Sequence, residues 1–170
     1  MSVAGDAEVS ARRAFAEAAV LLSGLFVGVI VAGDLGTKLL QLPPMLLQPW
    51  SFAVGLPMAA AGAAALASFG AFLSHHGRGT PYPRRPPQEL VTAGPFARVR
   101  NPLILAWGVA VLGIGIAMNW TGLVLLLIPL AVVVHVYVVY HEEPILTRRF
   151  GAEYEEYRER VPRWIPRFRP

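Results

Sequence analysis

Residues 94–105 read GPFARVRNPLIL and set Arg100 and Asn101 directly before a proline and a long apolar run. Pro102 lacks an N–H and has its φ fixed near the helical value, so it suits the first turn of a helix. The N-terminus of a helix carries unpaired N–H groups and a partial positive charge, which suits this junction to holding a carboxylate or a phosphate. The stretch therefore predicts a polar site at the mouth of an apolar helix. In the alternative interpretation, Arg98 and Arg100 only anchor a membrane span.

Composition favours an integral membrane protein. Of the 170 residues, 55% are hydrophobic and only 15% are charged, which is too apolar for an ordinary soluble domain. The chain has no cysteine, which excludes disulfides, thiolate metal sites and thiol nucleophiles. The net charge of +4 would also fit a nucleic-acid partner, but the basic residues gather beside the apolar segments. We therefore expect no nucleic-acid partner.

Four apolar segments are candidates for membrane helices. About 20 apolar residues, at a rise of about 1.5 Å each, cross the ~30 Å hydrocarbon core of a bilayer. We expect these spans over residues 14–32, 52–73, 102–118 and 123–140. Small residues recur every four positions in the first two spans, as at Gly24 and Gly28 and at Gly55 and Ala59, which predicts that these two spans pack together. Further spans follow the first one, which argues against a cleaved signal peptide.

A basic, proline-rich loop over residues 74–100 joins the second span to the third. Five prolines between Pro81 and Pro95 hold it extended and deny it regular structure. A loop of this length without its own secondary structure is usually functional or disordered. His75 and His76 stand at its start, but a pair of histidines there is typical of a helix end at the interface, and we predict no metal site.

The fourth span ends in His141, Glu142, Glu143 and Pro144. Two carboxylates at a membrane boundary are costly unless they are exposed or paired. They indicate either a functional site or, alternatively, the acidic start of another helix, whose N-terminus favours negative charge. His135, one to two turns inside the span, is a functional candidate for the same reason, or else a neutral histidine bonded to a backbone carbonyl.

Residues 145–161 carry apolar side chains at helical spacing, namely Leu146, Phe150, Tyr154, Tyr157 and Val161. This pattern predicts one amphipathic helix that lies against the membrane or caps the bundle. The predicted fold class is therefore all-α: an integral membrane bundle of about four transmembrane helices with a C-terminal amphipathic helix at the cytoplasmic side. We expect a single membrane domain over residues 1–170, with scaffold helices in 1–76 and a functional core in 77–170.

The distribution of positive charge predicts the topology. Every Lys and Arg except Lys38 falls before the first span, between the second and third spans, or after the fourth. By the positive-inside rule, four spans then place both termini in the cytoplasm, in a multi-pass protein of the cytoplasmic (inner) membrane. The 74–100 loop, the start of the third span, the two glutamates and the terminal helix should meet at that cytoplasmic face.

Two stretches resemble a known family. Residues 79–102, GTPYPRRPPQELVTAGPFARVRNP, and residues 141–167, HEEPILTRRFGAEYEEYRERVPRWIPR, are similar to the isoprenylcysteine carboxyl methyltransferases, which are related to the phospholipid methyltransferases. Members of that family are membrane-embedded enzymes that use S-adenosyl-L-methionine on the cytoplasmic side. Val138 stands where the eukaryotic prenylcysteine enzymes carry a substrate-contacting arginine, which argues against a prenylcysteine carboxylate as the acceptor.

The resemblance also implies a set of site residues. Those expected around the cofactor are Gln88, Glu89, Leu90, Val91, Phe96, Asn101, Pro102, Leu103, Ile104 and Glu142. We expect Glu142 and Arg100 to lie closest to the reacting end. His135 or His141 is the candidate to take a proton if the acceptor is an amine or a thiol.

The predicted function is thus methyl transfer from S-adenosyl-L-methionine to a lipophilic or small acceptor, a carboxylate, an amine or a thiol, with membrane lipid as the surrounding partner. Such a transfer needs the acceptor held in line with the S–CH₃ bond and water excluded. Two alternatives belong to other classes: an NADPH-dependent enzyme like the sterol reductases, and a non-catalytic membrane adaptor. Binding of NADPH, or of neither cofactor, would distinguish them.

Overall fold

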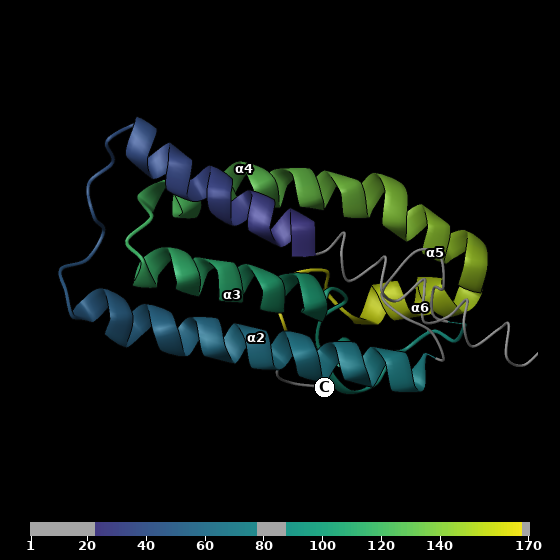
Figure 1. Ribbon diagram of the computed structural model, residues 1–170. Helices are drawn as coiled ribbons and strands as arrows, with labels where there is room; N and C mark the ends of the chain where they lie inside the picture. Colours follow the sequence, from purple (N-terminus) through teal and green to yellow (C-terminus); the bar gives the residue numbers. More distant parts are fainter. Residues whose placement is uncertain (1–22, 78–87, 168–170) are drawn as a thin grey trace, which may run out of the picture.

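The computed structural model describes residues 23–77 and 88–167, and every regular element in these ranges is helical (Figure 1). A first helix covers residues 23–39. The later helices are α2 (Trp50–His76), α3 (Pro102–Ala117), α4 (Thr121–Tyr137), α5 (Glu143–Phe150) and α6 (Ala152–Arg160), with a 3₁₀ turn at Gly94–Ala97 and a π turn at Val138–Glu142. The all-α prediction is confirmed for these residues. The residues before the first expected span, the start of that span and the prolines at 81–87 lie outside them.

The main helix pair is α2 with α3, whose backbones touch through small residues. A β-carbon placed on Gly62 would come within 2.7 Å of the Cα atom of Ala110, and one placed on Gly113 within 2.8 Å of the Cα atom of Ala59. Gly55 meets Ala117 in the same way one step further along. Such contacts let two apolar helices gain close van der Waals packing without a hydrophobic driving force between them.

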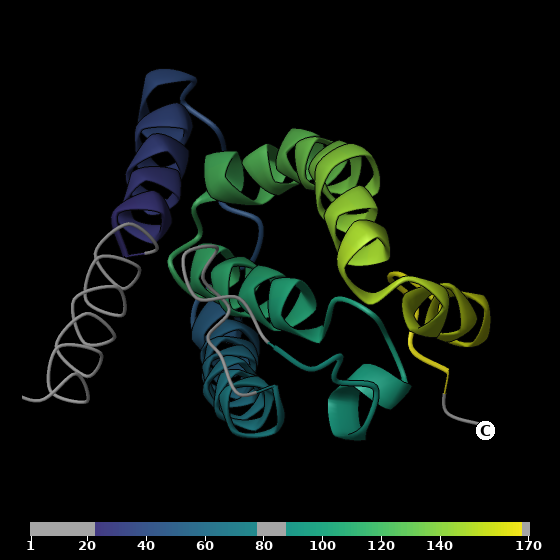
Figure 2. The same ribbon diagram turned by 90° about the vertical axis from the view of Figure 1, so that its right-hand side faces the viewer.

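This pairing corrects the expected partnership of the first two spans. The small-residue face of α2 is covered by α3, whereas a β-carbon on Gly24 or Gly28 would meet no other helix within 4 Å among the described residues. The helix over 23–39 instead lies beside the start of α4, as Figure 2 shows. There Gly33 abuts Leu123, and the backbone N–H of Gly122 donates to Thr37 Oγ1 over 2.9 Å. Glycine spacing predicted close helix contacts but could not say which partner would use them.

Two candidate membrane spans are clear in the described residues. One is α2, and the other is a continuous helix from Thr121 to Phe150 that comprises α4, the π turn and α5. Helix α3 is equally apolar but shorter, at 16 residues. The expected break after residue 140 is absent, because the helix runs on through the π turn into α5.

The expected single amphipathic helix is divided in two. Gly151, with φ +56° and ψ −131°, adopts a backbone conformation that favours glycine, and it separates α5 from α6. The apolar stripe nevertheless gathers as predicted into one cluster, formed by Tyr154, Tyr157, Val161, Leu90, Leu146 and Phe150. Helices α5 and α6 thus fold against each other at the end of the bundle where α2 ends and α3 begins (Figure 1).

Candidate functional site

A buried carboxylate holds two arginines from distant parts of the chain. Glu143 is 5% exposed, and its Oε1 accepts hydrogen bonds from Arg100 Nη1 at 2.7 Å and from Arg163 Nε at 2.6 Å. Arg163 Nη2 donates to the second oxygen, Oε2, at 2.9 Å. The bond to Glu143 raises the pKa of the Arg163 guanidinium above its usual value. Charge-assisted, bidentate bonds of this kind are strong, and removing one partner leaves an uncompensated buried charge.

The position of Glu143 depends on the π turn before it. The backbone N–H of Glu143 bonds to the carbonyl of Val138, five residues earlier, where an α-helix would use the fourth. Pro144 follows in the first turn of α5. Because its ring clashes with the carbonyl four residues back and it has no N–H to donate, proline disfavours a regular α-turn at this point. The π turn therefore joins α4 to α5 without a break.

The C-terminal tail, residues 161–167, closes over the 98–101 segment. The backbone N–H of Arg100 donates to the Pro162 carbonyl at 2.9 Å, and Asn101 Nδ2 donates to the Arg163 carbonyl at 3.2 Å. Further along, the N–H of Arg167 donates to the Arg98 carbonyl at 3.0 Å. The 98–101 segment is thus hydrogen-bonded to the tail, and these bonds bring Arg100 and Arg163 to Glu143.

Helix α6 covers the segment that precedes α3. The Tyr157 hydroxyl donates to the Phe96 carbonyl at 2.8 Å, and Val91 and Phe96 are buried in the same region. Burial raises the pKa of the Tyr157 phenol. Burial and the nearby Glu143 carboxylate also raise the pKa of the Tyr154 phenol, which keeps both hydroxyls protonated at ordinary pH. The Tyr157 phenol must be neutral to donate its proton to the Phe96 carbonyl.

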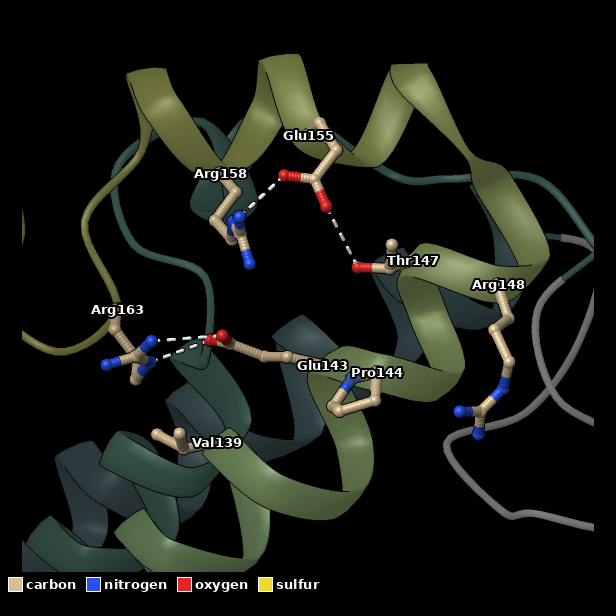
Figure 3. A pocket seen from close by; sticks show the side chains of 8 residues that line it. All are labelled: Val139, Glu143, Pro144, Thr147, Arg148, Glu155, Arg158 and Arg163. Carbon is tan, nitrogen blue, oxygen red and sulfur yellow. Dashed lines mark hydrogen bonds and ion pairs between the residues drawn. The ribbon is translucent and has the colours of Figure 1, made fainter.

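A pocket of about 450 Å³ lies between α5, α6 and the tail (Figure 3). Its size falls within the range of small-molecule sites. Glu143 and Arg163 form one side of it, and Thr147 on the opposite side donates to Glu155, which also pairs with Arg158 at 2.6 Å. Its lining residues are Val139, Glu143, Pro144, Thr147, Arg148, Glu155, Arg158 and Arg163. The pocket therefore presents both carboxylates and guanidiniums, next to the apolar side chains of Val139 and Pro144.

The residues expected at the reacting end occupy two environments. Arg100 is largely buried against Glu143, and its Nε has no hydrogen-bond partner among the described residues. Glu142 is half-buried, and within 23–77 and 88–167 no hydrogen bond or ion pair reaches its carboxylate. The adjacent Glu143, which was not among the residues expected around the cofactor, is the one that pairs with Arg100.

His135 is exposed on α4, and its Nδ1 accepts a hydrogen bond from Trp164 Nε1 at 2.9 Å. The alternative expected for this histidine, a bond to a backbone carbonyl, is replaced by a bond to the tail. Because Nδ1 is the acceptor, the neutral ring carries its proton on Nε2. His141 lies against Tyr137, with ring centroids 5.0 Å apart.

The other expected cofactor residues lie either in the 88–96 segment that precedes α3 or in the first turn of α3. Gln88 and Glu89 are exposed, and their backbone N–H groups donate to the Gly77 carbonyl. Leu90, Val91 and Phe96 pack beneath α6. In α3, Pro102 is buried, while Leu103 and Ile104 are half-buried.

Sequence reasoning named Glu143 only as a member of the glutamate pair, and it did not place Glu143, Arg163, Thr147, Glu155 or Arg158 among the expected site residues. Arg163 and Glu143 both stood inside the quoted motifs, and a proline directly after a glutamate pair was a signal that the preceding turn would not be a regular one. No signal of comparable strength marked Thr147 or Arg158, whose contacts depend on the fold of α5 against α6.

Comparison with known proteins bears on these residues. A family model described as phospholipid methyltransferase matches residues 49–153, a range that includes both candidate membrane spans, the 98–101 segment and both glutamates. No curated protein and no solved structure matches the chain. The family match covers more than half of the sequence, and it contains the VRNP motif and the glutamate pair, on which part of the resemblance rested. The chain therefore belongs to the phospholipid methyltransferase family.

Proposed function

We propose that the protein transfers a methyl group from S-adenosyl-L-methionine to a lipophilic or small acceptor at the cytoplasmic face of the inner membrane. Family membership implies methyltransferase activity in general. The observation that carries the proposal is the convergence of the 98–101 segment, the glutamate pair and the tail where the continuous helix 121–150 leaves its apolar stretch. An acceptor that enters from the bilayer would meet polar groups first at this point.

The proposed topology has four spans, with the helix over 23–39 and α3 crossing the membrane beside α2 and α4. The ends of α2 and α4 and the start of α3 lie at the same end of the bundle as α5 and α6 (Figure 1). Arginines are numerous there, as at Arg98, Arg148 and Arg158, whereas the loop over 40–49 at the other end contains none. The positive-inside rule supports placing the arginine-rich end in the cytoplasm.

The site fits a ligand that carries both positive and negative groups. Among the described residues no hydrogen bond or ion pair engages the Glu142 carboxylate, and the buried Nε of Arg100 has no hydrogen-bond acceptor. S-adenosyl-L-methionine has an ammonium, a sulfonium and a carboxylate, which are the complementary charges. We propose that Glu142 binds its cationic or ribose groups. The residues proposed to complete the cofactor site are Gln88, Glu89, Leu90, Val91, Phe96, Asn101, Pro102, Leu103 and Ile104.

When bound, this cofactor supplies an electrophilic methyl group. The protein's task is to hold the acceptor in line with it and to exclude water. Helix α6 bonds to Phe96 and the tail bonds to Asn101, and we propose that both shield this segment from water. His135 can take a proton from the acceptor through Nδ1 only after Trp164 moves, because that atom already accepts the indole N–H. His141, which has no such bond among the described residues, is the second candidate.

Titration with S-adenosylhomocysteine in nanodiscs tests the proposal. The wild-type chain should bind it, and Glu142→Gln should weaken binding by about one to two decades, because a charge-assisted hydrogen bond is worth roughly 1.5 to 3 kcal/mol. Glu153→Gln, which alters an exposed glutamate on α6, is the matched control and should leave affinity unchanged. Binding of NADPH alone would support a reductase instead, and binding of neither ligand would support an adaptor.

A further inference from the structure

Two neighbouring residues of the tail contact two residues on the long helix. Arg163 binds Glu143 through both carboxylate oxygens, and Trp164 donates to His135, eight positions before Glu143. Adjacent tail residues can reach two helix residues about two turns apart only when both helix residues lie on the same face. The tail is thus fixed to the helix at two levels, one at the end of α4 and one at the start of α5.

The π turn decides which glutamate lies on that face. In a regular α-helix, residues i and i+7 share a face, so Glu142 would lie below His135. A π turn closes its hydrogen bond over five residues where an α-turn uses four, which adds one residue to the turn. The residue eight positions on then takes the place of the seventh. Glu143 therefore faces the tail, and Glu142 is rotated by roughly 100°, the angle between successive residues of a helix.

We propose that Glu143 is a positioning residue of the methyltransferase site. The π turn directs Glu143, and not Glu142, toward the tail, so that Glu142 can bind the ligand. This inference rests on the proposed function for its effect on ligand binding. Through Arg163 the Glu143 carboxylate holds the tail, and through Arg100 it holds the start of α3. Glu143 acts on the ligand only through these two arginines and through the closure of the tail.

Charge and burial argue that an uncharged side chain cannot replace Glu143. Both of its oxygens are used, one of them twice, and the Arg100 side chain beside it is only 9% exposed. Glutamine has one acceptor oxygen and an N–H₂ group that would face the guanidiniums. Two cations would then remain close together with no compensating charge, and the tail would separate from the helix.

Three variants at the glutamate pair test the inference: Glu143→Gln, Glu143→Asp and Glu142→Gln. Trypsin cleavage after Arg160, followed by mass spectrometry without ligand, reports whether the tail is held. S-adenosylhomocysteine affinity, measured on the folded fraction, reports the site. Glu143→Gln should increase cleavage about tenfold and weaken affinity about tenfold, and Glu143→Asp should recover part of both. Glu142→Gln should weaken affinity and leave cleavage at the wild-type rate.

The outcomes separate this inference from the proposed function. If wild-type protein does not bind S-adenosylhomocysteine, the proposed function fails, while the contrast in cleavage between the two glutamine variants still reports on the tail. If wild-type protein binds and Glu143→Gln keeps wild-type affinity or cleavage, the positioning role is overturned. A purely structural role would lower the melting temperature but leave the affinity of the folded fraction unchanged. Should Glu143→Gln fail to fold, Arg163→Ala removes the same contact from the tail and should give the same two effects.

A register variant tests the π turn itself. Deleting Val139 together with Pro144→Ala permits a regular α-helix in which the present Glu143 stands seven positions after His135. The tail should stay protected from trypsin, and adding Glu143→Gln to this variant should release it. Release by Glu142→Gln in place of Glu143→Gln would overturn the assignment.

Discussion

Gly62 of α2 and Ala110 of α3 are in direct backbone contact: a β-carbon on Gly62 would lie 2.8 Å from the Ala106 carbonyl oxygen and 2.7 Å from the Cα atom of Ala110. Neither neighbour is a flexible side chain that can turn away. We predict that Gly62→Ala forces α2 and α3 apart and destabilises the protein by about 1 to 3 kcal/mol, the usual cost of overpacking. A fall in melting temperature in detergent would show this.

Gly108, on α3 in the same helix pair, provides the control. In the described part of the chain, a β-carbon there would meet no atom within 4 Å outside the backbone of α3, so Gly108→Ala should be neutral or slightly stabilising, because alanine is the better helix former. Equal destabilisation by the two substitutions would mean that helix contact is not the reason for glycine at position 62.

The Tyr157 hydroxyl bond predicts a loss of stability at alkaline pH. Burial raises the pKa of this phenol above its ordinary value of 10.0, so the unfolded phenol ionises first as pH rises. The contribution is therefore fully present below about pH 10 and is lost above it. Melting temperature measured from pH 8 to 11, with phenolate absorbance recorded in parallel, should show the fall.

Tyr157→Phe should change that profile. It removes the donor to the buried Phe96 carbonyl and should cost roughly 1 to 3 kcal/mol at neutral pH, the penalty of leaving a buried acceptor unsatisfied. Its melting temperature should then decline less steeply above pH 10. An unchanged alkaline slope would assign the pH dependence to other groups.

The proposed topology is testable because the chain contains no cysteine. Single substitutions Leu47→Cys and Gln88→Cys place a thiol on exposed residues at opposite ends of α2, because Leu47 stands just before Trp50 and the Gln88 N–H donates to the Gly77 carbonyl. An impermeant maleimide should label position 47 in intact cells and position 88 only after permeabilisation, because the arginine-rich end is proposed to face the cytoplasm. Labelling of position 88 from outside would refute the four-span arrangement.

Sequence by itself determined the helical class, the apolar segments and the motifs. These depend on local properties, since hydrophobic runs, proline positions and the apolar stripe from Leu146 to Val161 act within a few residues of one another. The motifs at the 98–101 segment and at the glutamate pair placed polar groups beside apolar helices, and the family match covers both.

Only the tertiary structure decided which small-residue face pairs with which helix, and which glutamate is buried. Gly24 and Gly55 stand in similar patterns, yet only Gly55 meets another helix, because a spacing rule fixes a face but not its partner. Likewise, seven residues of regular α-helix from His135 would place Glu142, and not Glu143, on the face that contacts the tail. One extra residue in the π turn places Glu143 within hydrogen-bond distance of the two arginines. No local sequence pattern predicts that Arg163, twenty residues later, folds back to this position.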